Sequence, residues 1–393
     1  MVTQENIRGG QQGVTLIELM VGALVATTII AGGYAVLTSS SKAMTTNEQT
    51  VETQQNVRVA MEFLFRDIRQ AGFGMNGPVG NCPTAIVPAD HTPAGSDRGP
   101  DQISLVVPVG NTVGTATDPP WLLNNNTSIG SGAPLALPSA IAVTNMVSEA
   151  GGSLTVPPAV ISIGGAITTT VTAAAGANLT VPTVNLPTAM KQNSPIYLLQ
   201  CITYQIIPPP DLPSAGFPVA SFPTGACAGR APCLVRGVAG GLDATGKLSC
   251  TTAGSRCTSI ADEIEDIQFA YGCDGCVAAV NGGIADGIID NQGGIAGFDQ
   301  ADFVTNIAWG TGLMTADKIQ LAQLTIVGRQ RRADQGFGES NQQTVQGAAL
   351  QVSDHLHSDG LFAAGDFATL TPTYTSTRRR LLTRTIELRN LRH

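Results

Sequence analysis

The chain is 393 residues long, more than one typical domain requires, and its 43% hydrophobic and 13% charged residues allow a sizeable buried core. The formal net charge of −8 excludes a general electrostatic attraction to nucleic acid, so any basic surface must be local. The 45 glycines and 23 prolines, together with many Thr, Ser and Val residues, favour strands and turns after the amino-terminal region.

A single carboxylate lies near the start of a long apolar segment at the amino terminus. Between Val14 and Leu37 the only charged residue is Glu18, and the segment has about the 20 residues that a bilayer core requires. It therefore predicts a membrane-spanning helix. An ionisable side chain inside such a span is energetically costly, which makes Glu18 a candidate functional residue that needs a partner.

The residues before Val14 indicate what that partner is. They are polar and lack the apolar stretch and the small-residue cleavage site of a secretory signal, so a cut after Gly13 would leave the apolar helix attached. Val14 would then carry a new terminal ammonium group, which Glu18 could neutralise on a neighbouring subunit. The alternative is an uncleaved single-span anchor.

The segment from Gly13 to Glu18, with the sequence GVTLIE, resembles the cleavage and methylation motif of type IV pilins. The resemblance implies that a prepilin peptidase cuts after Gly13, that the mature terminus Val14 is N-methylated and that Glu18 acts in assembly. It also implies a leader peptide at residues 1–13, a transmembrane half of the helix at 14–37 and an amphipathic half at 38–72.

The helix is predicted to continue beyond the span, because residues 42–69 are mostly polar and include no proline. Apolar side chains recur there at the spacing of one helical face, at Val57, Met61, Leu64, Phe65 and Ile68. We expect that face to pack on a sheet. Residues 72–77 match the dinucleotide-binding pattern GxGxxG, but they follow a helix instead of a strand, so we interpret them as a helix stop without a nucleotide site.

Six later segments are predicted strands of an antiparallel sheet, at 101–107, 197–207, 234–236, 264–271, 318–327 and 382–388, the first of them at Asp101. Residues 108–190 are almost free of charge, and their Val, Thr and Ile segments are broken by Gly and Pro, which indicates short strands or a threonine-rich surface insertion. The expected fold class is α+β, with the long helix packed on an antiparallel β-rich head at residues 73–393.

Four segments resemble motifs of the PilW family of minor pilins, in the order in which that family carries them. They are DIRQAGF at 67–73, IEDIQFAYG at 264–272, the strand at 318–329 and the closing segment 380–390. The resemblance implies a structural component, not an enzyme, that takes part in type IV pilus assembly by initiating or capping the filament. The alternatives are a J-type pseudopilin of a type II secretion system, and a pilus-tip adhesin or DNA-binding subunit.

The resemblance also implies where the chain resides and what it contacts. The precursor would be a single-pass inner-membrane protein in contact with lipid, with its head in the periplasm, and it would then pass to the pilus, at or near the tip, on the cell surface. Its implied partners are prepilin peptidase, the inner-membrane assembly platform, the major pilin and other minor pilins.

A basic patch lies at the carboxy terminus, formed by Arg378, Arg379, Arg380, Arg384, Arg389 and Arg392. Arginines on the exposed side of a strand are typical of a solvated face, or they pair with carboxylates of an adjacent subunit. We favour these roles over contact with DNA phosphates, so nucleic acid is not an expected partner.

Eight cysteines form an even set in a compartment that permits disulfides: Cys82, Cys201, Cys227, Cys233, Cys250, Cys257, Cys273 and Cys276. Short separations favour Cys227 with Cys233, Cys250 with Cys257 and Cys273 with Cys276, which leaves Cys82 with Cys201, although eight cysteines allow 105 connectivities. A zinc site is the alternative, but only Cys273 and Cys276 have the two-residue spacing typical of its ligands.

A glycine-rich loop after the last cysteine pair concentrates oxygen ligands, namely Asp286, Asp290 and Asn291, with Asp274, Asp299 and Asp302 close in sequence. Calcium takes six to eight oxygen ligands, so it is the candidate cofactor here, but the loop lacks the alternating carboxylates and closing Glu of an EF-hand. The alternative is that these residues form turns. No other cofactor and no catalytic site are predicted.

Overall fold

The computed structural model describes residues 13–89, 100–126, 134–182, 190–207, 227, 232–238, 256–277, 280–291, 302–305, 313–332, 350–351, 356–357 and 377–391. The chain divides into two compact units, Met1–Val51 and Glu52–His393. Its elements are one long helix and a set of antiparallel sheets, which is the predicted α+β class.

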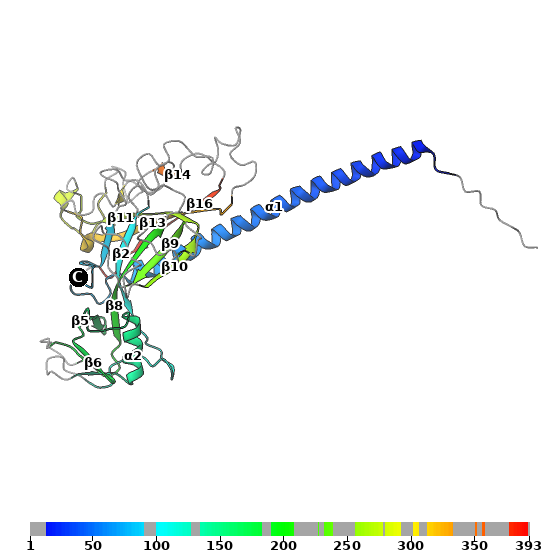
Figure 1. Cartoon of the computed structure of the whole chain (residues 1–393). Helices are drawn as coiled ribbons and strands as arrows, with labels where there is room; N and C mark the ends of the chain where they lie inside the picture. The colour runs from blue at the N-terminus through cyan, green and yellow to red at the C-terminus, as the bar shows by residue number, and fades with distance from the viewer. Residues whose placement is uncertain are drawn as a thin grey trace, which may run out of the picture. The chain divides into compact units, whose positions relative to one another are not determined.

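The helix α1, Leu16–Gln70, is continuous over 55 residues (Figure 1). Its first buried residue is Thr53, and from there the buried side chains recur at steps of three and four, at Val57, Ala60, Met61, Leu64, Asp67 and Ile68. This spacing confirms the predicted packing face of the second half of the helix. The helix ends before Gly72, whose φ of 79° lies in the left-handed region that favours glycine, as expected for a helix stop.

Seven antiparallel strands form the larger sheet. Its main path runs through β1 (Ile86–Ala89), β2 (Gln102–Val109), β8 (Ile196–Ile207), β4 (Val160–Ile163) and β5 (Ile167–Thr170), and β8 also pairs with β9 (Cys233–Val238), which pairs with β10 (Arg256–Asp262). Strand β8 is the centre of this sheet, because one of its edges pairs with β2 and the other is divided between β4 and β9.

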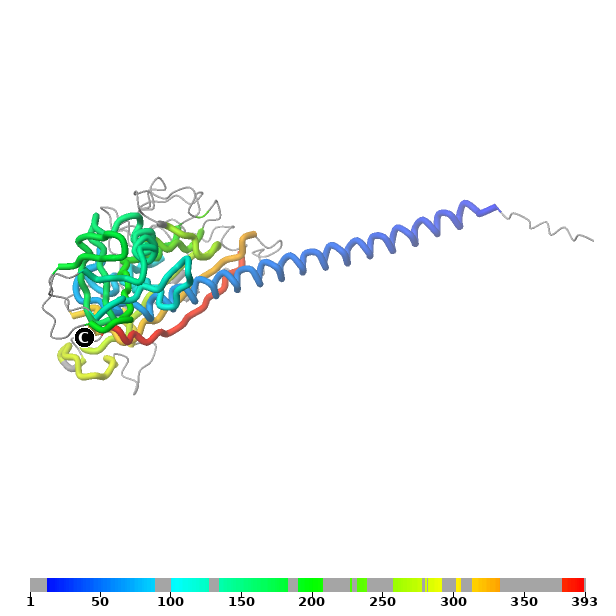
Figure 2. The backbone as a smooth tube through the Cα atoms, turned by 90° about the horizontal axis from the view of Figure 1, so that it is seen from below, coloured from blue at the N-terminus to red at the C-terminus, as the bar shows by residue number. Residues whose placement is uncertain are grey.

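The second sheet has four strands in the order β12 (Val304–Thr305), β11 (Ile264–Cys273), β13 (Ile319–Arg329) and β16 (Arg379–Glu387). One hydrophobic core joins both sheets to the second half of α1, and Leu64, Tyr204, Phe269 and Leu324 are all fully buried in it. Strands β13 and β16 run beside this part of the helix (Figure 2). Two short strands, β14 (Leu350–Gln351) and β15 (Leu356–His357), form a separate pair.

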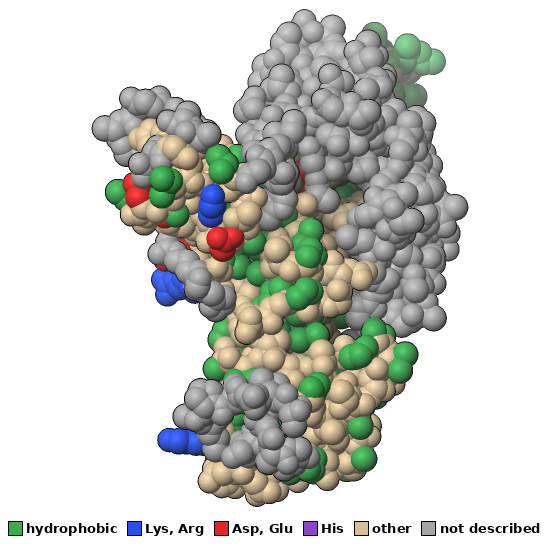
Figure 3. Space-filling view, turned by 90° about the vertical axis from the view of Figure 1, so that its left-hand side faces the viewer, with side chains coloured by type: hydrophobic (Ala, Val, Ile, Leu, Met, Phe, Trp, Pro, Cys, Tyr) green, Lys and Arg blue, Asp and Glu red, His purple; other side chains and the backbone are tan. Residues whose placement is uncertain are grey.

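The insertion between β2 and β8 has a hydrophobic core of its own, which includes Trp121, Leu135, Met146 and Leu179. It contributes β4 and β5 to the larger sheet, and it also contains α2 (Ala140–Glu149), β3 (Leu135–Ala136), β6 (Ala173–Ala175) and β7 (Asn178–Thr180). On the face drawn in Figure 3, this lobe presents mostly uncharged and apolar side chains.

Several elements of the head were not predicted from the sequence, among them β1, β10, α2 and the two-residue strands β12, β14 and β15. The first strand is β1, whereas the sequence predicted the segment that begins at Asp101. Strand β1 was missed because it has only four residues and contains Pro88, and a proline weakens the sequence pattern of a strand. The polar strand β10 was not predicted. The helix α2 was also missed, although Ser139 caps it by accepting the Ala142 amide at 3.3 Å, because its charge-poor sequence shows little polar face.

Replacing Gly328 with Ala should lower the free energy of unfolding by about 2–3 kcal/mol, since a β-carbon there would overlap Cγ2 of Val57 on α1. Val57 is β-branched and has one favoured rotamer in a helix, so it cannot turn away. Urea unfolding of the full chain would measure the loss. Adding Val57→Ala to Gly328→Ala should recover part of it, and additive losses in the double variant would contradict the predicted close approach.

Candidate functional site

The residues of the predicted cleavage junction lead directly into α1. Gly13, Val14 and Thr15 precede the first helical residue, Leu16, and Thr15 and Glu18 hydrogen-bond to each other in both directions. The amide and the hydroxyl of Thr15 donate to Oε2 of Glu18 at 3.1 and 3.0 Å, and the amide of Glu18 donates to Oγ1 of Thr15 at 3.3 Å. This arrangement is a capping box, which satisfies amide donors that the first helical turn leaves free.

The capping box determines what Glu18 can still bind. Both of its residues follow Gly13, so a cut after Gly13 would leave the box intact, with Val14 immediately before it. Within the described residues, Oε1 of Glu18 accepts no hydrogen bond. One carboxylate oxygen therefore holds the start of the helix while the other remains available to a cation. Sequence reasoning missed Thr15, although a T-x-x-E spacing before an apolar run is itself a signal.

The first half of α1 exposes a continuous apolar surface. Leu16, Ile17, Leu24 and Leu37 are each between 69% and 77% exposed, and α1 is the one helix in the described part of the chain that is long and apolar enough to cross a membrane. The hydroxyls of Thr27 and Thr38 donate to carbonyl groups one turn back, so these polar groups are satisfied without water. Such a surface is stable only against lipid or against other apolar helices.

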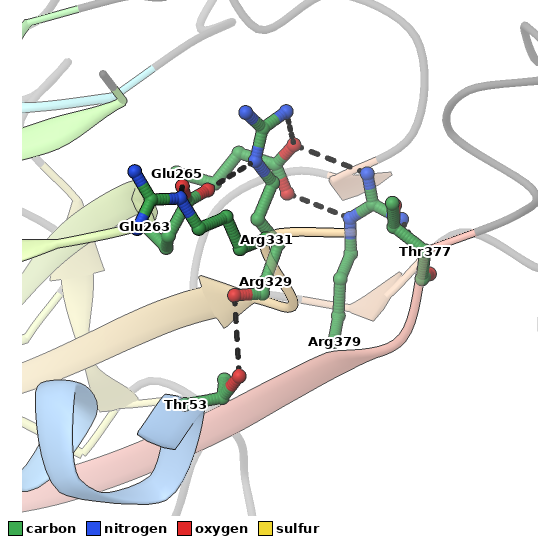
Figure 4. A network of polar contacts seen from close by, with 7 residues as sticks. All are labelled: Thr53, Glu263, Glu265, Arg329, Arg331, Thr377 and Arg379. Carbon is green, nitrogen blue, oxygen red and sulfur yellow. Dashed lines mark hydrogen bonds and ion pairs between the residues drawn. The ribbon is translucent and has the colours of Figure 1, made fainter. Parts of the chain in front are cut away.

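A buried ion network lies at one end of the second sheet, beside Thr53 (Figure 4). The hydroxyl of Thr53 donates to the carbonyl of Arg329 at 3.3 Å, and Nε of Arg329 donates to Glu263 at 2.9 Å. Arg379 donates to both oxygens of Glu265 at 2.6 and 3.1 Å, and these two side chains are only 6% and 5% exposed. Burial raises the pKa of Glu263, although Arg329 acts to lower it. The network ties β11, β13 and β16 together and holds α1 against them.

A second buried carboxylate, Asp67, lies on the packed face of α1. Its Oδ2 accepts from the Tyr204 hydroxyl at 2.7 Å and from Nε of Arg236 at 3.0 Å, and its Oδ1 accepts from Nε of Arg66 at 3.2 Å. Burial raises the pKa of Tyr204, and the Asp67 charge raises it further, so the hydroxyl stays protonated and donates. These contacts join the end of α1 to β8 and β9.

The carboxy-terminal region, which contains the ion network except Thr53, is similar to a known protein family. Residues 226–390 match the family model of PilW, the type IV pilus-assembly protein W. This match covers less than half of the chain, and it supports a role in type IV pilus assembly. No curated protein and no solved structure matches the chain. The PilW match includes the strands from β9 to β16 and all of the ion network except Thr53, whereas the junction at Gly13, the helix α1 and the insertion lie outside it.

Three disulfides lie within the described residues. The structure joins Cys82 to Cys201, Cys227 to Cys233 and Cys273 to Cys276, which are the pairs that the sequence favoured. Cys257 is also disulfide-bonded, but Cys250, its expected partner, lies outside the described residues. The Cys82–Cys201 bond connects the segment after α1 to the central strand β8, and both cysteines precede the PilW match.

The loop that was considered for calcium is held by its own backbone. Asp290 accepts the amides of Gly275, Cys276 and Val277 at 2.9–3.0 Å with its two oxygens. In the same way, Asp274 accepts the amides that begin the facing turn, from Asp286 at 2.9 Å and from Gly287 at 2.8 Å.

This geometry is that of a turn-forming loop, and calcium binding stays a prediction. The oxygens of Asp274 and Asp290 face N–H donors, and the Asp286 carboxylate accepts the amide of Ile288 at 3.0 Å in an exposed turn. Asn291 and Asp302 lie within the described residues, and Asp299 lies outside them. For the zinc alternative, Cys273, Cys276 and Asp290 place ligand atoms within 4.8 Å of one another, but the two sulfurs are bonded to each other.

The carboxy-terminal arginines of the PilW region differ from the predicted exposed patch, because several pair within the chain. Arg379 is buried against Glu265, Arg384 contacts Glu62 on α1 at 3.2 Å, and Arg389 contacts Glu387 at 2.9 Å. The guanidinium of Arg384 also lies 3.6 Å from the ring centre of Phe65. The sequence missed this because the antiparallel register of β16 brings it beside α1, far away along the chain. Arg392 lies outside the described residues.

Proposed function

We propose that this chain is a minor pilin that is cut after Gly13, N-methylated at Val14 and placed at or near the end of a type IV pilus, where it initiates or caps the filament. The observation that carries the proposal is the capping box between Thr15 and Glu18, which sets a carboxylate one turn into an exposed apolar helix, next to the cleavage residue. The PilW match supports the assembly role.

The proposed mechanism follows from the high energetic cost of an unpaired terminal ammonium group in a medium of low dielectric constant. As long as the chain is a precursor, its apolar helix spans the inner membrane, with the head in the periplasm. After the cut by prepilin peptidase, the ammonium of Val14 is an expensive charge inside an apolar helix bundle. Oε1 of Glu18 on a neighbouring pilin offsets that charge, while Oε2 keeps the bond to Thr15, so the helices leave the bilayer as a neutralised bundle on the assembly platform.

The size of the head supports a position at the filament end. The head carries an insertion with its own core, and a bulky subunit need not be repeated along a shaft when it is present in few copies. The neighbours in that position would be the major pilin and other minor pilins.

Glu18→Ala and Glu18→Gln should both be cleaved normally, because Gly13 is unchanged, yet both should be about tenfold or more depleted in sheared surface pili. An uncompensated charge in a bilayer costs about 2.5–3.5 kcal/mol, and 1.4 kcal/mol corresponds to tenfold. The measurement is the ratio of this chain in sheared pili to the chain in the membrane fraction. Glu18→Gln keeps an oxygen that can accept from Thr15, so it separates the charge from the capping box.

Two outcomes would count against the proposal. Normal incorporation of Glu18→Gln would remove the charge-pair mechanism. In a strain without the chain, normal pili together with lost enzyme secretion would indicate that the protein is a secretion pseudopilin. Lost pili with normal secretion would support the pilus role. The complemented strain is the control in both measurements.

A further inference from the structure

A polar cavity of about 470 Å³ lies in the head, between the last turn of α1 and the larger sheet. Its walls come from α1, from the end of β2, from β8, β9 and β10, and from the last residue of α2. The charged side chains in the lining are Arg66, Asp67, Glu149 and Arg236. The cavity therefore joins the PilW region, through β9 and β10, to the insertion, through α2.

Asp67 holds the two arginines of this cavity in place by accepting a hydrogen bond from the Nε atom of each. Asp67 itself is only 2% exposed. The side chain of Arg236 also hydrogen-bonds to Tyr204, and the guanidinium of Arg66 lies 5.1 Å from the ring centre of Phe63. Within the part of the chain that the structure describes, the terminal nitrogens of Arg66 have no hydrogen-bond partner. Asp67 also accepts from Tyr204, so one buried carboxylate faces two guanidinium groups, and Glu149 is the second carboxylate of the lining.

We propose that this cavity binds a carboxylate group through the terminal nitrogens of Arg66 and Arg236. A guanidinium group presents its N–H donors in a planar fork that matches a carboxylate, and Asp67 fixes both forks before the ligand arrives. Arg236 is only 20% exposed, so its bond to a ligand is partly shielded from water, whereas Arg66 is 58% exposed and stands nearer to solvent. The carboxylate comes either from a free small acid or from an Asp or Glu side chain of a neighbouring pilus subunit.

Substitution of Glu149 should strengthen binding of a carboxylate, whereas substitution of either arginine should weaken it. Glu149 is the other carboxylate of the lining, and its backbone carbonyl accepts from Nε2 of Gln200 at 2.5 Å. A carboxylate ligand is repelled by the Glu149 charge, so Glu149→Gln should strengthen binding, and the contact with Gln200 survives because it uses the backbone. If Arg66 and Arg236 served only to anchor Asp67, Glu149→Gln would have no effect on ligand affinity.

The experiment titrates the full chain in detergent with two probes and follows its thermal unfolding. Glutarate represents a free acid, and the blocked peptide acetyl-Gly-Glu-Gly-amide carries a single side-chain carboxylate. At tenfold excess over the dissociation constant, a bound probe should raise Tm by about 2–4 °C. Arg66→Gln should weaken binding about tenfold, Arg236→Gln should do the same, and Glu149→Gln should tighten it about threefold.

Arg58→Gln is the matched control, because Arg58 is exposed on α1 and does not line the cavity. It should leave both titrations unchanged. A shift with the peptide identifies a side-chain carboxylate as a ligand, and a shift with glutarate alone identifies a free acid. The proposal is overturned if neither probe shifts Tm, or if the shift persists in Arg66→Gln and Arg236→Gln. Because the readout is binding, it does not depend on the cleavage at Gly13 or on pilus assembly.

Discussion

Replacing Arg379 with Met is expected to lower the free energy of unfolding by about 3–5 kcal/mol. The guanidinium of Arg379 donates to both oxygens of Glu265, and both side chains are almost completely buried. Without it, the Glu265 carboxylate would lose both of these hydrogen bonds, and its contact with Nη1 of Arg329 is longer, at 3.8 Å. A buried charge that loses its partner cannot regain its hydration, so the loss is much larger than that of a surface ion pair.

Arg389→Met is the matched control for this prediction, because it makes the same substitution just beyond the end of the same strand. Arg389 and Glu387 are 72% and 61% exposed, so breaking their pair should cost less than about 1 kcal/mol. Urea unfolding of the full chain, followed by circular dichroism, gives both values. Equal losses in the two variants would contradict the buried network, and Arg379→Met combined with Glu265→Leu should recover much of the loss.

Removing the Cys82–Cys201 disulfide by a double substitution to Ala should cost about 3–5 kcal/mol. The two cysteines are 119 positions apart, and cross-linking a loop of that length removes much conformational entropy from the unfolded chain. The bond also adds a covalent link to the hydrogen bond between Asp67 and Tyr204, since Cys82 follows the helix α1 and Cys201 lies in β8. Its loss should therefore loosen the helix on the sheet.

The other disulfides provide an internal comparison for this result. Cys227 and Cys233 are six positions apart, so the same loop-entropy argument gives about 2.4 kcal/mol for that bond. The Cys273–Cys276 bond spans three positions and is supported by Asp290, so its loss should cost least. Unfolding midpoints of the three double-Ala variants would give the order, and an order that does not follow the separations would refute the entropic explanation. Peptide mapping of the unreduced chain would check the pairs directly.

The local features of this protein were readable from the sequence, because they depend on periodicity over a few residues. The helix α1 and its packing face follow from the spacing of Val57, Met61 and Leu64, and six strands were predicted close to their observed positions. The elements that were missed carry weak local signals. Strand β1 is short and contains a proline, and α2 is a helix with no charged residue before Glu149.

In the candidate site, too, some residues could be named from the local sequence and others could not. Gly13, Val14 and Glu18 could be named from the sequence, because the junction of a polar leader, a glycine and an apolar run with one carboxylate is contiguous. Thr15 is also local, and only its hydrogen bonds to Glu18 required the structure. By contrast, nothing near Asp67 in the sequence indicates that Tyr204, 137 positions away, is its partner.

What the sequence determined by itself is thus the long apolar helix, the strand-rich head and the resemblance to PilW, while the cleavage junction at Gly13 stays a prediction. The tertiary structure alone decided which charges are paired. Arg379 was predicted to be exposed and is buried against Glu265, 114 positions away, because the register of β16 on β13 sets its neighbours. Arg66 and Arg236 meet at Asp67 only because α1 packs across β8 and β9. Such pairs depend on strand register and helix packing, and neither is encoded in a short stretch of sequence.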